Sequence, residues 1–162
     1  MFAKPILDLA TKVLNDARSR GLHIVIAESC TGGLVAGALT EIAGASDVVD
    51  CGFVVYTNEA KSQLLGVPPA LIARHGAVSA EVARALAEGA LAHSFAHASI
   101  AVTGIAGPSG GSPEKPVGLV HIAAARQGRD RLIEEHRFGD IGREQVRLKS
   151  VEAALKLLSR VL

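Results

Sequence analysis

Aromatic residues are scarce in this sequence, and neither sign of charge is in excess. There is no tryptophan, one tyrosine and four phenylalanines among 162 residues, and 17 basic against 16 acidic side chains give a net charge of +1. Proteins that bind nucleic acid use a basic excess to contact phosphates, and those that bind single strands also stack bases on aromatic rings. The composition therefore argues against a nucleic-acid partner.

Cysteines and long apolar runs are also few. Cys30 and Cys51 do not make the disulfide framework of a small secreted domain, and no C-x-x-C or H-E-x-x-H spacing predicts a metal site. No window holds the ~18 uninterrupted apolar residues of a membrane span, and the N-terminal residues lack the apolar core of a signal peptide. We expect a cytoplasmic protein with no membrane partner, no metal and no cofactor.

The length suits a single domain over residues 1–162. Apolar residues at helical spacing and capping signals predict helices over residues 5–20, 34–42, 58–65, 79–93 and 140–162. Segments rich in β-branched or apolar residues predict strands over residues 23–27, 48–57, 98–103, 117–125 and 131–138. Residues 71–78 are interpreted as a connector.

Strands alternate with helices for the first two-thirds of the chain, which predicts parallel crossover connections. The last two strands flank a turn at Gly128 and form a predicted hairpin, so the sheet is expected to be mixed. The predicted fold is α/β, with about five strands and helices on both faces of the sheet.

A small polar turn with the sequence AESCTGG, residues 27–33, stands between the first predicted strand and the next helix. In a parallel α/β sheet such a turn lies where ligands bind, and the start of a helix offers unpaired N–H groups to an anion. The simpler interpretation is that Ser29 or Thr31 is the N-cap of the helix. Two hydroxyls and a thiol followed by two glycines exceed what a cap requires, so the turn is also a candidate site.

A serine nucleophile needs a group that removes its proton. Ser29 lacks the G-x-S-x-G sequence of a nucleophile elbow, and none of the six histidines is clearly placed beside it. Lys61 is the alternative base, because Ser-Lys pairs are an established variant, and it follows Tyr56, the only tyrosine, by five residues. Tyr56 would relay a proton or hydrogen-bond the lysine. The competing interpretation is a solvated Lys61 and a half-buried Tyr56 without a role.

A glycine-rich segment, residues 104–116, follows the third predicted strand. The spacing of Gly104, Gly107 and Gly110 matches neither the dinucleotide-binding G-x-G-x-x-G sequence nor a Walker A loop. The loop either cradles a phosphate or an amide, or is merely flexible. If three parallel strands end together, this loop meets the Ser29 turn and the 56–61 segment at one edge of the sheet.

Five motifs in this order resemble the CinA C-terminal domain family, also known as the PncC-type nicotinamide mononucleotide amidohydrolases. They are AESCTGG at 27–33, YTNEAK at 56–61, GAVS at 76–79, VTGIAGP at 102–108 and EKPVG at 114–118. The resemblance covers nearly the whole chain and implies a three-layer α/β/α sandwich. It implies hydrolysis of the carboxamide of nicotinamide mononucleotide to nicotinate mononucleotide and ammonia, in pyridine-nucleotide recycling. We expect the stand-alone form, without the N-terminal domain of some relatives.

By this resemblance the nucleophile is Ser29, with Tyr56 and Lys61 as its activating partners. Thr103 and Arg143 match positions that line the family's site.

The substrate would then meet five further residues. N–H groups near Thr31 and Gly32 would stabilise the oxyanion. Thr103 and Gly104 would orient the nucleotide. Arg143 would meet the 5′-phosphate, in its own subunit's site or in a neighbour's.

Two other functions stay open at this point. One is a catalytically silent module that senses a nucleotide through a partner, and the other is a Ser-Lys hydrolase of a different small amide. The expected partners are a small-molecule nucleotide and further copies of this chain, in a homodimer or a higher homo-oligomer.

Overall fold

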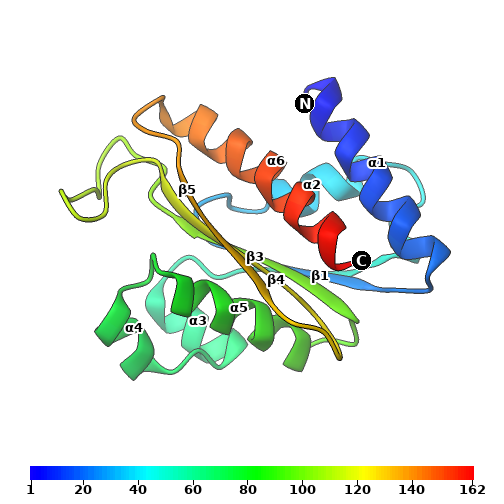
Figure 1. The fold of residues 1–162 in the computed structure, drawn as a ribbon, viewed down its shortest axis with the longest axis horizontal. Helices are drawn as coiled ribbons and strands as arrows, with labels where there is room; N and C mark the ends of the chain where they lie inside the picture. Colours follow the sequence, from blue (N-terminus) through cyan, green and yellow to red (C-terminus); the bar gives the residue numbers. More distant parts are fainter.

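A five-stranded mixed sheet separates two layers of helices in the computed structural model, which describes residues 1–162 (Figure 1). The strand order is β2-β1-β3-β4-β5. β1 pairs in parallel with β2 and β3, whereas β4 runs antiparallel to both β3 and β5. The bounds are β1 Ile24–Glu28, β2 Val49–Val54, β3 Ala98–Gly104, β4 Leu119–Arg126 and β5 Leu132–Arg137. The predicted mixed α/β sheet is confirmed, including the hairpin at Gly128.

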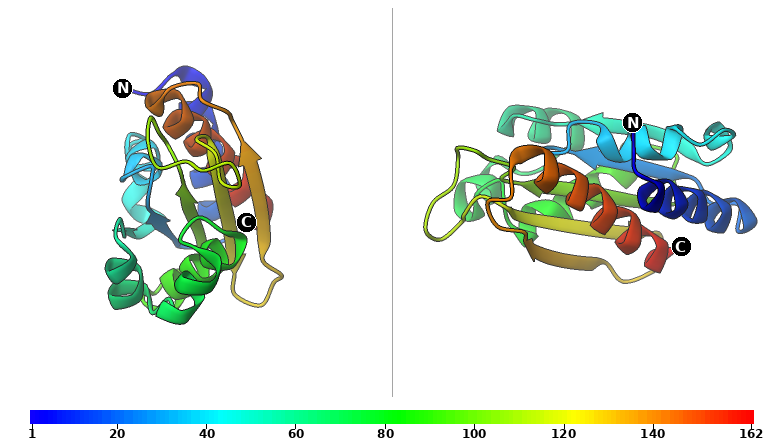
Figure 2. Two further views of the ribbon diagram at one scale, coloured as in Figure 1. Left: turned by 90° about the vertical axis from the view of Figure 1, so that its left-hand side faces the viewer. Right: turned by 90° about the horizontal axis from the view of Figure 1, so that it is seen from above.

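Three helices cover each face of the sheet (Figures 1 and 2). One layer contains α1 (Lys4–Ser19), α2 (Leu34–Thr40) and α6 (Arg143–Val161). The other contains α3 (Asn58–Leu65), α4 (Pro69–His75) and α5 (Ala80–Ala92), and a short 3₁₀ helix, η1 (Ala45–Asp47), precedes β2. This is the expected three-layer sandwich. None of these helices combines the length and the apolar sequence needed to cross a bilayer.

Successive residues of the central strands face different helical layers, because side chains alternate along a strand. On β1, Ile24 and Ile26 pack with α1, α2 and α6, while Val25 and Ala27 pack with α3, α4 and α5. Nearly every residue of β1 and β3 is buried, as expected for parallel strands covered on both faces. The continuous apolar runs of the sequence therefore supply two cores, one on each side of the sheet.

The interpretation of residues 71–78 as a connector is wrong for most of its length. Residues 69–75 form the short helix α4, which begins at Pro69 and ends before Gly76. A proline suits the first turn of a helix because its missing N–H has no partner there. Ile72 is buried against α5, so packing supports a helix whose own sequence signal is weak.

The carboxyl ends of the three parallel strands meet at one edge of the sheet, as predicted. Glu28, the last residue of β1, lies opposite Val54 of β2 and Val102 of β3. Beyond the paired residues, the Ser29 N–H donates to the Val102 carbonyl at 3.0 Å and the Val55 N–H donates to the Glu28 carbonyl at 2.8 Å. The segments that follow the three strands therefore start side by side.

Candidate active site

Ser29 lies in the turn between β1 and α2, and two backbone hydrogen bonds hold it. Its N–H donates to the Val102 carbonyl of β3, and its own carbonyl accepts from the Gly32 N–H at 3.0 Å. The side chain is buried, with 8% of the residue exposed. The hydroxyl therefore belongs to a rigid turn that is tied to the central strand.

Lys61 reaches the serine from α3, with its Nζ 3.5 Å from Ser29 Oγ. The residue is 1% exposed, and its amine also donates to the carbonyls of Val55, Tyr56 and Thr57 at 3.1, 3.3 and 3.5 Å. It has no carboxylate partner, and burial lowers the pKa of the Lys61 amine below its usual value. The structure thus excludes a solvated Lys61 and places a partly desolvated amine beside the hydroxyl.

Tyr56 is in the same region, but its hydroxyl makes a different contact from the predicted one. The residue is 56% exposed, and its hydroxyl accepts a hydrogen bond from Nη2 of Arg143 at 2.9 Å. No hydrogen bond joins this hydroxyl to Lys61, because only the backbone carbonyl of Tyr56 faces the amine. Nη1 of Arg143 donates to the Gly107 carbonyl at 2.9 Å, so the arginine links Tyr56 to the glycine-rich loop.

A pocket of about 260 Å³ opens at this place, close to the lower end of the range for small-molecule sites, roughly 300–1,000 Å³. Its lining includes six of the predicted residues: Ser29, Tyr56, Lys61, Thr103, Gly104 and Arg143. A larger groove of about 730 Å³ runs along α3 and α4, but none of the predicted site residues lines it. The smaller pocket is therefore the candidate active site, because the predicted catalytic residues line it. Arg143 and Ser29 of the same chain both contribute to it.

The structure corrects the roles expected of Thr31 and Gly32, neither of which lines the pocket. The Thr31 hydroxyl is fully buried and has no hydrogen-bond partner, so substrate has no access to it. The Gly32 N–H is already bonded to the Ser29 carbonyl, which leaves the Thr31 N–H as the group of this pair without an acceptor in the chain. Gly32 has a φ of 59°, a left-handed conformation that favours glycine.

The N-terminus of α2 is occupied by Glu28 rather than capped by Ser29 or Thr31. The Glu28 carboxylate accepts from the N–H groups of Gly33, Val35 and Ala36 at 3.1, 3.0 and 2.9 Å. The residue is 1% exposed, so its charge is matched by these donors and by the positive end of the helix. This arrangement ties α2 to β1, but it removes the helix start as a site for a substrate anion.

The glycine-rich loop packs closely and is not a merely flexible segment. A Cβ added at Gly104 would lie 2.7 Å from Val120 Cγ2 and 2.9 Å from the Leu119 carbonyl oxygen. Only glycine permits this approach of β3 to β4. The loop is further fixed by Lys115, whose amine donates to the carbonyls of His75 and Val78.

Thr103 acts on the same wall of the pocket from β3. Its hydroxyl donates to the Ala77 carbonyl at 2.8 Å, and the residue is 1% exposed. Ala77 and Val78 both line the pocket. Thr103 and Lys115 together therefore hold the 75–78 segment, which forms the wall on the side of α4 and α5.

Cys30 also lines the pocket, immediately after the serine. Burial raises the pKa of its thiol to about 12, so the thiol stays protonated and is a poor nucleophile at neutral pH. The side chain belongs to the core beneath α1, α2 and α6. Of these two adjacent residues, Ser29 is therefore the better candidate for the nucleophile.

The family model of the CinA C-terminal domain matches residues 6–162 of this chain. The chain belongs to this family. A CinA-like protein of Anaeromyxobacter dehalogenans is 51% identical over 151 residues, which are 93% of this chain and 36% of that protein. A putative competence-damage inducible protein of Caldicellulosiruptor bescii is 48% identical over 139 residues, 86% of this chain and 33% of that protein. The chain thus spans about a third of the length of the curated relatives it matches.

Solved structures of CinA-family proteins share the whole fold. The competence/damage inducible protein CihA from Agrobacterium tumefaciens is 52% identical with a TM-score of 0.98, and the match covers 99% of this chain and 98% of that one. The competence damage-inducible protein A from Klebsiella pneumoniae is 35% identical with a TM-score of 0.90, over 96% and 95% of the two chains. These likenesses show the CinA family and its fold.

Three residues that shape this CinA-family site were not assigned a role from the sequence: Glu28, Lys115 and Arg147. Glu28 and Lys115 belong to motifs that carry the resemblance. The position of Glu28, a carboxylate at the end of a buried strand just before a helix, is a sequence signal for a cap of that helix. Arg147 follows Arg143 by one helical turn, which places both on one face of α6. Its guanidinium donates to the carbonyls of Cys30 and Thr31, a contact between residues 117 and 116 positions apart that local patterns do not reveal.

Replacing Glu28 with glutamine should destabilise the fold by about 1–3 kcal/mol, because three N–H groups lose a charged acceptor and one amide N–H₂ faces them. Urea unfolding would measure the change. Glu41→Gln is the matched control, since Glu41 is exposed at the other end of α2 and its substitution should change the free energy of unfolding by less than about 0.5 kcal/mol. Equal effects of the two substitutions would contradict the capping role of Glu28.

Thr31→Val should leave the free energy of unfolding unchanged or raise it by up to about 1 kcal/mol, because the buried hydroxyl that it removes has no partner. The same substitution at Thr103 removes a hydrogen bond to Ala77 and should cost about 1 kcal/mol. Thermal or urea unfolding of the two variants compares them directly. A larger loss at Thr31 than at Thr103 would show that the Thr31 hydroxyl is bonded in solution.

Proposed function

We propose that this protein is an amidohydrolase that converts nicotinamide mononucleotide to nicotinate mononucleotide and ammonia, in pyridine-nucleotide recycling. The observation that carries the proposal is the approach of the buried Lys61 amine, without a carboxylate partner, to within 3.5 Å of Ser29 Oγ. Family membership and the motif resemblance support the choice of substrate.

In the first half of the reaction, Lys61 accepts the proton of Ser29 as Oγ attacks the carboxamide carbon. A backbone N–H of the Ser29 turn stabilises the oxyanion that forms. The carbon–nitrogen bond then breaks, and the leaving nitrogen takes the proton from Lys61 and departs as ammonia. The product of this half is an ester between Ser29 and the nicotinate group.

In the second half, a water molecule gives its proton to Lys61 and attacks the ester carbon. The ester bond breaks, the proton returns from Lys61 to Ser29 Oγ, and nicotinate mononucleotide leaves. All proton transfers run between water, the amide nitrogen, Ser29 and Lys61, so the scheme requires no external reductant or oxidant. The side chains of Cys30, Tyr56 and Thr103 form no covalent bond in it.

Arg143 is the cation best placed to meet the 5′-phosphate. It lies at the start of α6, lines the pocket, and pairs with no carboxylate, since its donors contact the Gly107 carbonyl and the Tyr56 hydroxyl. A guanidinium engaged only by neutral acceptors keeps its charge available for a phosphate. In this proposal Tyr56 orients Arg143, while Thr103 and Gly104 shape the wall against which the nucleotide lies. Assembly as a homodimer or a higher homo-oligomer belongs to the same proposal.

Ser29→Ala should reduce ammonia release from nicotinamide mononucleotide by at least about 10³-fold, because the reaction then lacks its nucleophile. Enzyme-coupled detection of ammonia measures this, with binding of the nucleotide followed by calorimetry in the same samples. Cys30→Ser serves as the control and should retain turnover. Binding without turnover in the wild type would indicate a sensing module instead, and turnover of other amides alone would change the substrate.

The pH dependence of kcat/KM should report on Lys61. Only the neutral amine accepts the Ser29 proton, so activity should rise with pH through an apparent pKa below the usual lysine value of about 10.4. Lys61→Arg keeps the positive charge at every accessible pH and should lower kcat about 10²–10⁴-fold, without the rise. A wild-type profile that shows no rise at any pH at which the protein is folded, or that falls with pH, would exclude Lys61 as the base.

A further inference from the structure

Arg147 forms hydrogen bonds to the turn that carries Ser29, but none to the serine itself. It lies on α6, half-buried, and its Nε and Nη2 donate to the carbonyls of Cys30 and Thr31 at 3.1 and 2.9 Å. It takes part in none of the chain's ion pairs. A guanidinium presents its donors as a rigid fork, so two consecutive carbonyls engaged by one arginine are fixed relative to each other.

The turn between β1 and α2 is contacted from two different layers of the molecule. Arg147 holds its carbonyls from α6, whereas Lys61 reaches the Ser29 hydroxyl from α3, in the layer on the other side of the sheet (Figure 1). The turn therefore lies between the arginine that holds its backbone and the amine that faces its hydroxyl.

The peptide unit between Thr31 and Gly32 adds a second restraint. Arg147 holds the Thr31 carbonyl, and the Gly32 N–H of that unit donates to the Ser29 carbonyl. A Cβ added at Gly32 would lie 3.3 Å from Nη2 of Arg147, so glycine leaves room for the guanidinium to bind the turn. Arg147 and the Gly32 N–H therefore restrain the same short segment that carries Ser29.

We propose that Arg147 is a positioning residue for this site: by holding the Cys30 and Thr31 carbonyls from α6, it fixes the turn that presents the Ser29 hydroxyl to Lys61. The inference rests on the proposed function, because it assigns to Arg147 a part in the same hydrolysis. Arg147 makes no hydrogen bond to Ser29 and does not line the pocket. Its effect passes through the backbone of the turn.

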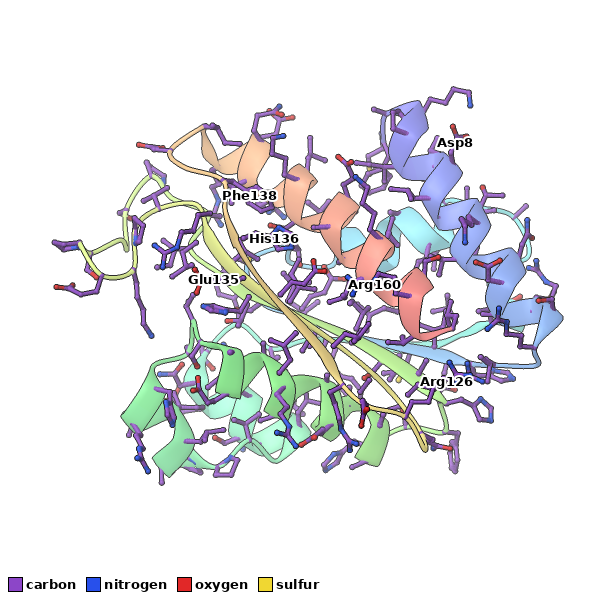
Figure 3. The ribbon with its side chains drawn as sticks, in the orientation of Figure 1. Asp8, Arg126, Glu135, His136, Phe138 and Arg160 are labelled. Carbon is purple, nitrogen blue, oxygen red and sulfur yellow. The ribbon has the colours of Figure 1, made fainter.

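The experiment compares Arg147→Gln and Arg147→Lys with Arg160→Gln. Arg160 lies on the same helix, towards its far end (Figure 3). It forms an ion pair with Glu134 on β5. The kinetic constants kcat and KM are measured for hydrolysis of nicotinamide mononucleotide. Hydrogen exchange of the peptide that spans residues 28–36 is measured without substrate, with a peptide from β4 as the report on global folding.

Arg147→Gln should lower kcat about 10²-fold, because a displaced nucleophile loses reactivity, and leave KM within about twofold. Arg147→Lys should recover less than about a tenth of the lost rate, because one ammonium does not reproduce the fork. The midpoint of the pH profile should stay unchanged, since Lys61 is untouched. Exchange in residues 28–36 should become faster in both variants while β4 keeps its protection, and Arg160→Gln should match the wild type in every measurement.

Other outcomes overturn the inference. A raised KM with unchanged kcat would make Arg147 a substrate-binding residue, and full rescue by lysine would show that its charge, rather than its geometry, matters. Unchanged exchange in residues 28–36 would show that Arg147 does not hold the turn. If the wild type does not hydrolyse the nucleotide, the proposed function fails, and hydrogen exchange alone then decides whether Arg147 positions these peptide units.

Discussion

The buried amine of Lys61 is the interaction on which the rest of the site depends. A charged ammonium without an acidic partner is costly to bury, and here three backbone carbonyls and one hydroxyl are its only acceptors. The carbonyls come from the chain that links β2 to α3, so the amine also fixes the path of that connection. Burial favours the neutral amine and the carbonyls favour the ammonium, and the net lowering of the pKa shows that burial dominates.

The serine turn is restrained by the sheet and by the helical layer that contains α2 and α6. Glu28 ties the turn to the start of α2, Arg147 ties it to α6, and the Ser29 N–H ties it to β3. Each restraint acts on the backbone, which leaves the Ser29 hydroxyl as the mobile group that faces Lys61. Such support is what a preorganised site requires, because a nucleophile displaced by about 1 Å loses much of its reactivity.

The mixed topology supplies the remaining walls of the pocket. The parallel strands β1, β2 and β3 bring three loops to one edge, and the antiparallel strand β4 returns the chain from the glycine-rich loop beneath them. Close contact between Gly104 and Val120, together with the bond from Lys115 to the Val78 carbonyl, holds this loop in place. Arg143 closes the rim from α6. Every layer of the sandwich therefore contributes to one small pocket.

Sequence patterns predicted the strands, the long helices and the meeting of three loops. Apolar periodicity and β-branched runs extend over a few neighbouring residues, and they reflect which side chains are buried. They failed for α4, where seven residues without strong periodicity are helical through packing on α5. The motifs selected Ser29 and Lys61, since chemistry restricts residue type, and the family resemblance added Arg143. What only the tertiary structure decided is which distant groups touch: Tyr56 meets Arg143, and Arg147 meets the Ser29 turn. These contacts depend on where side chains point after distant segments pack together, and no local pattern in the chain encodes that direction.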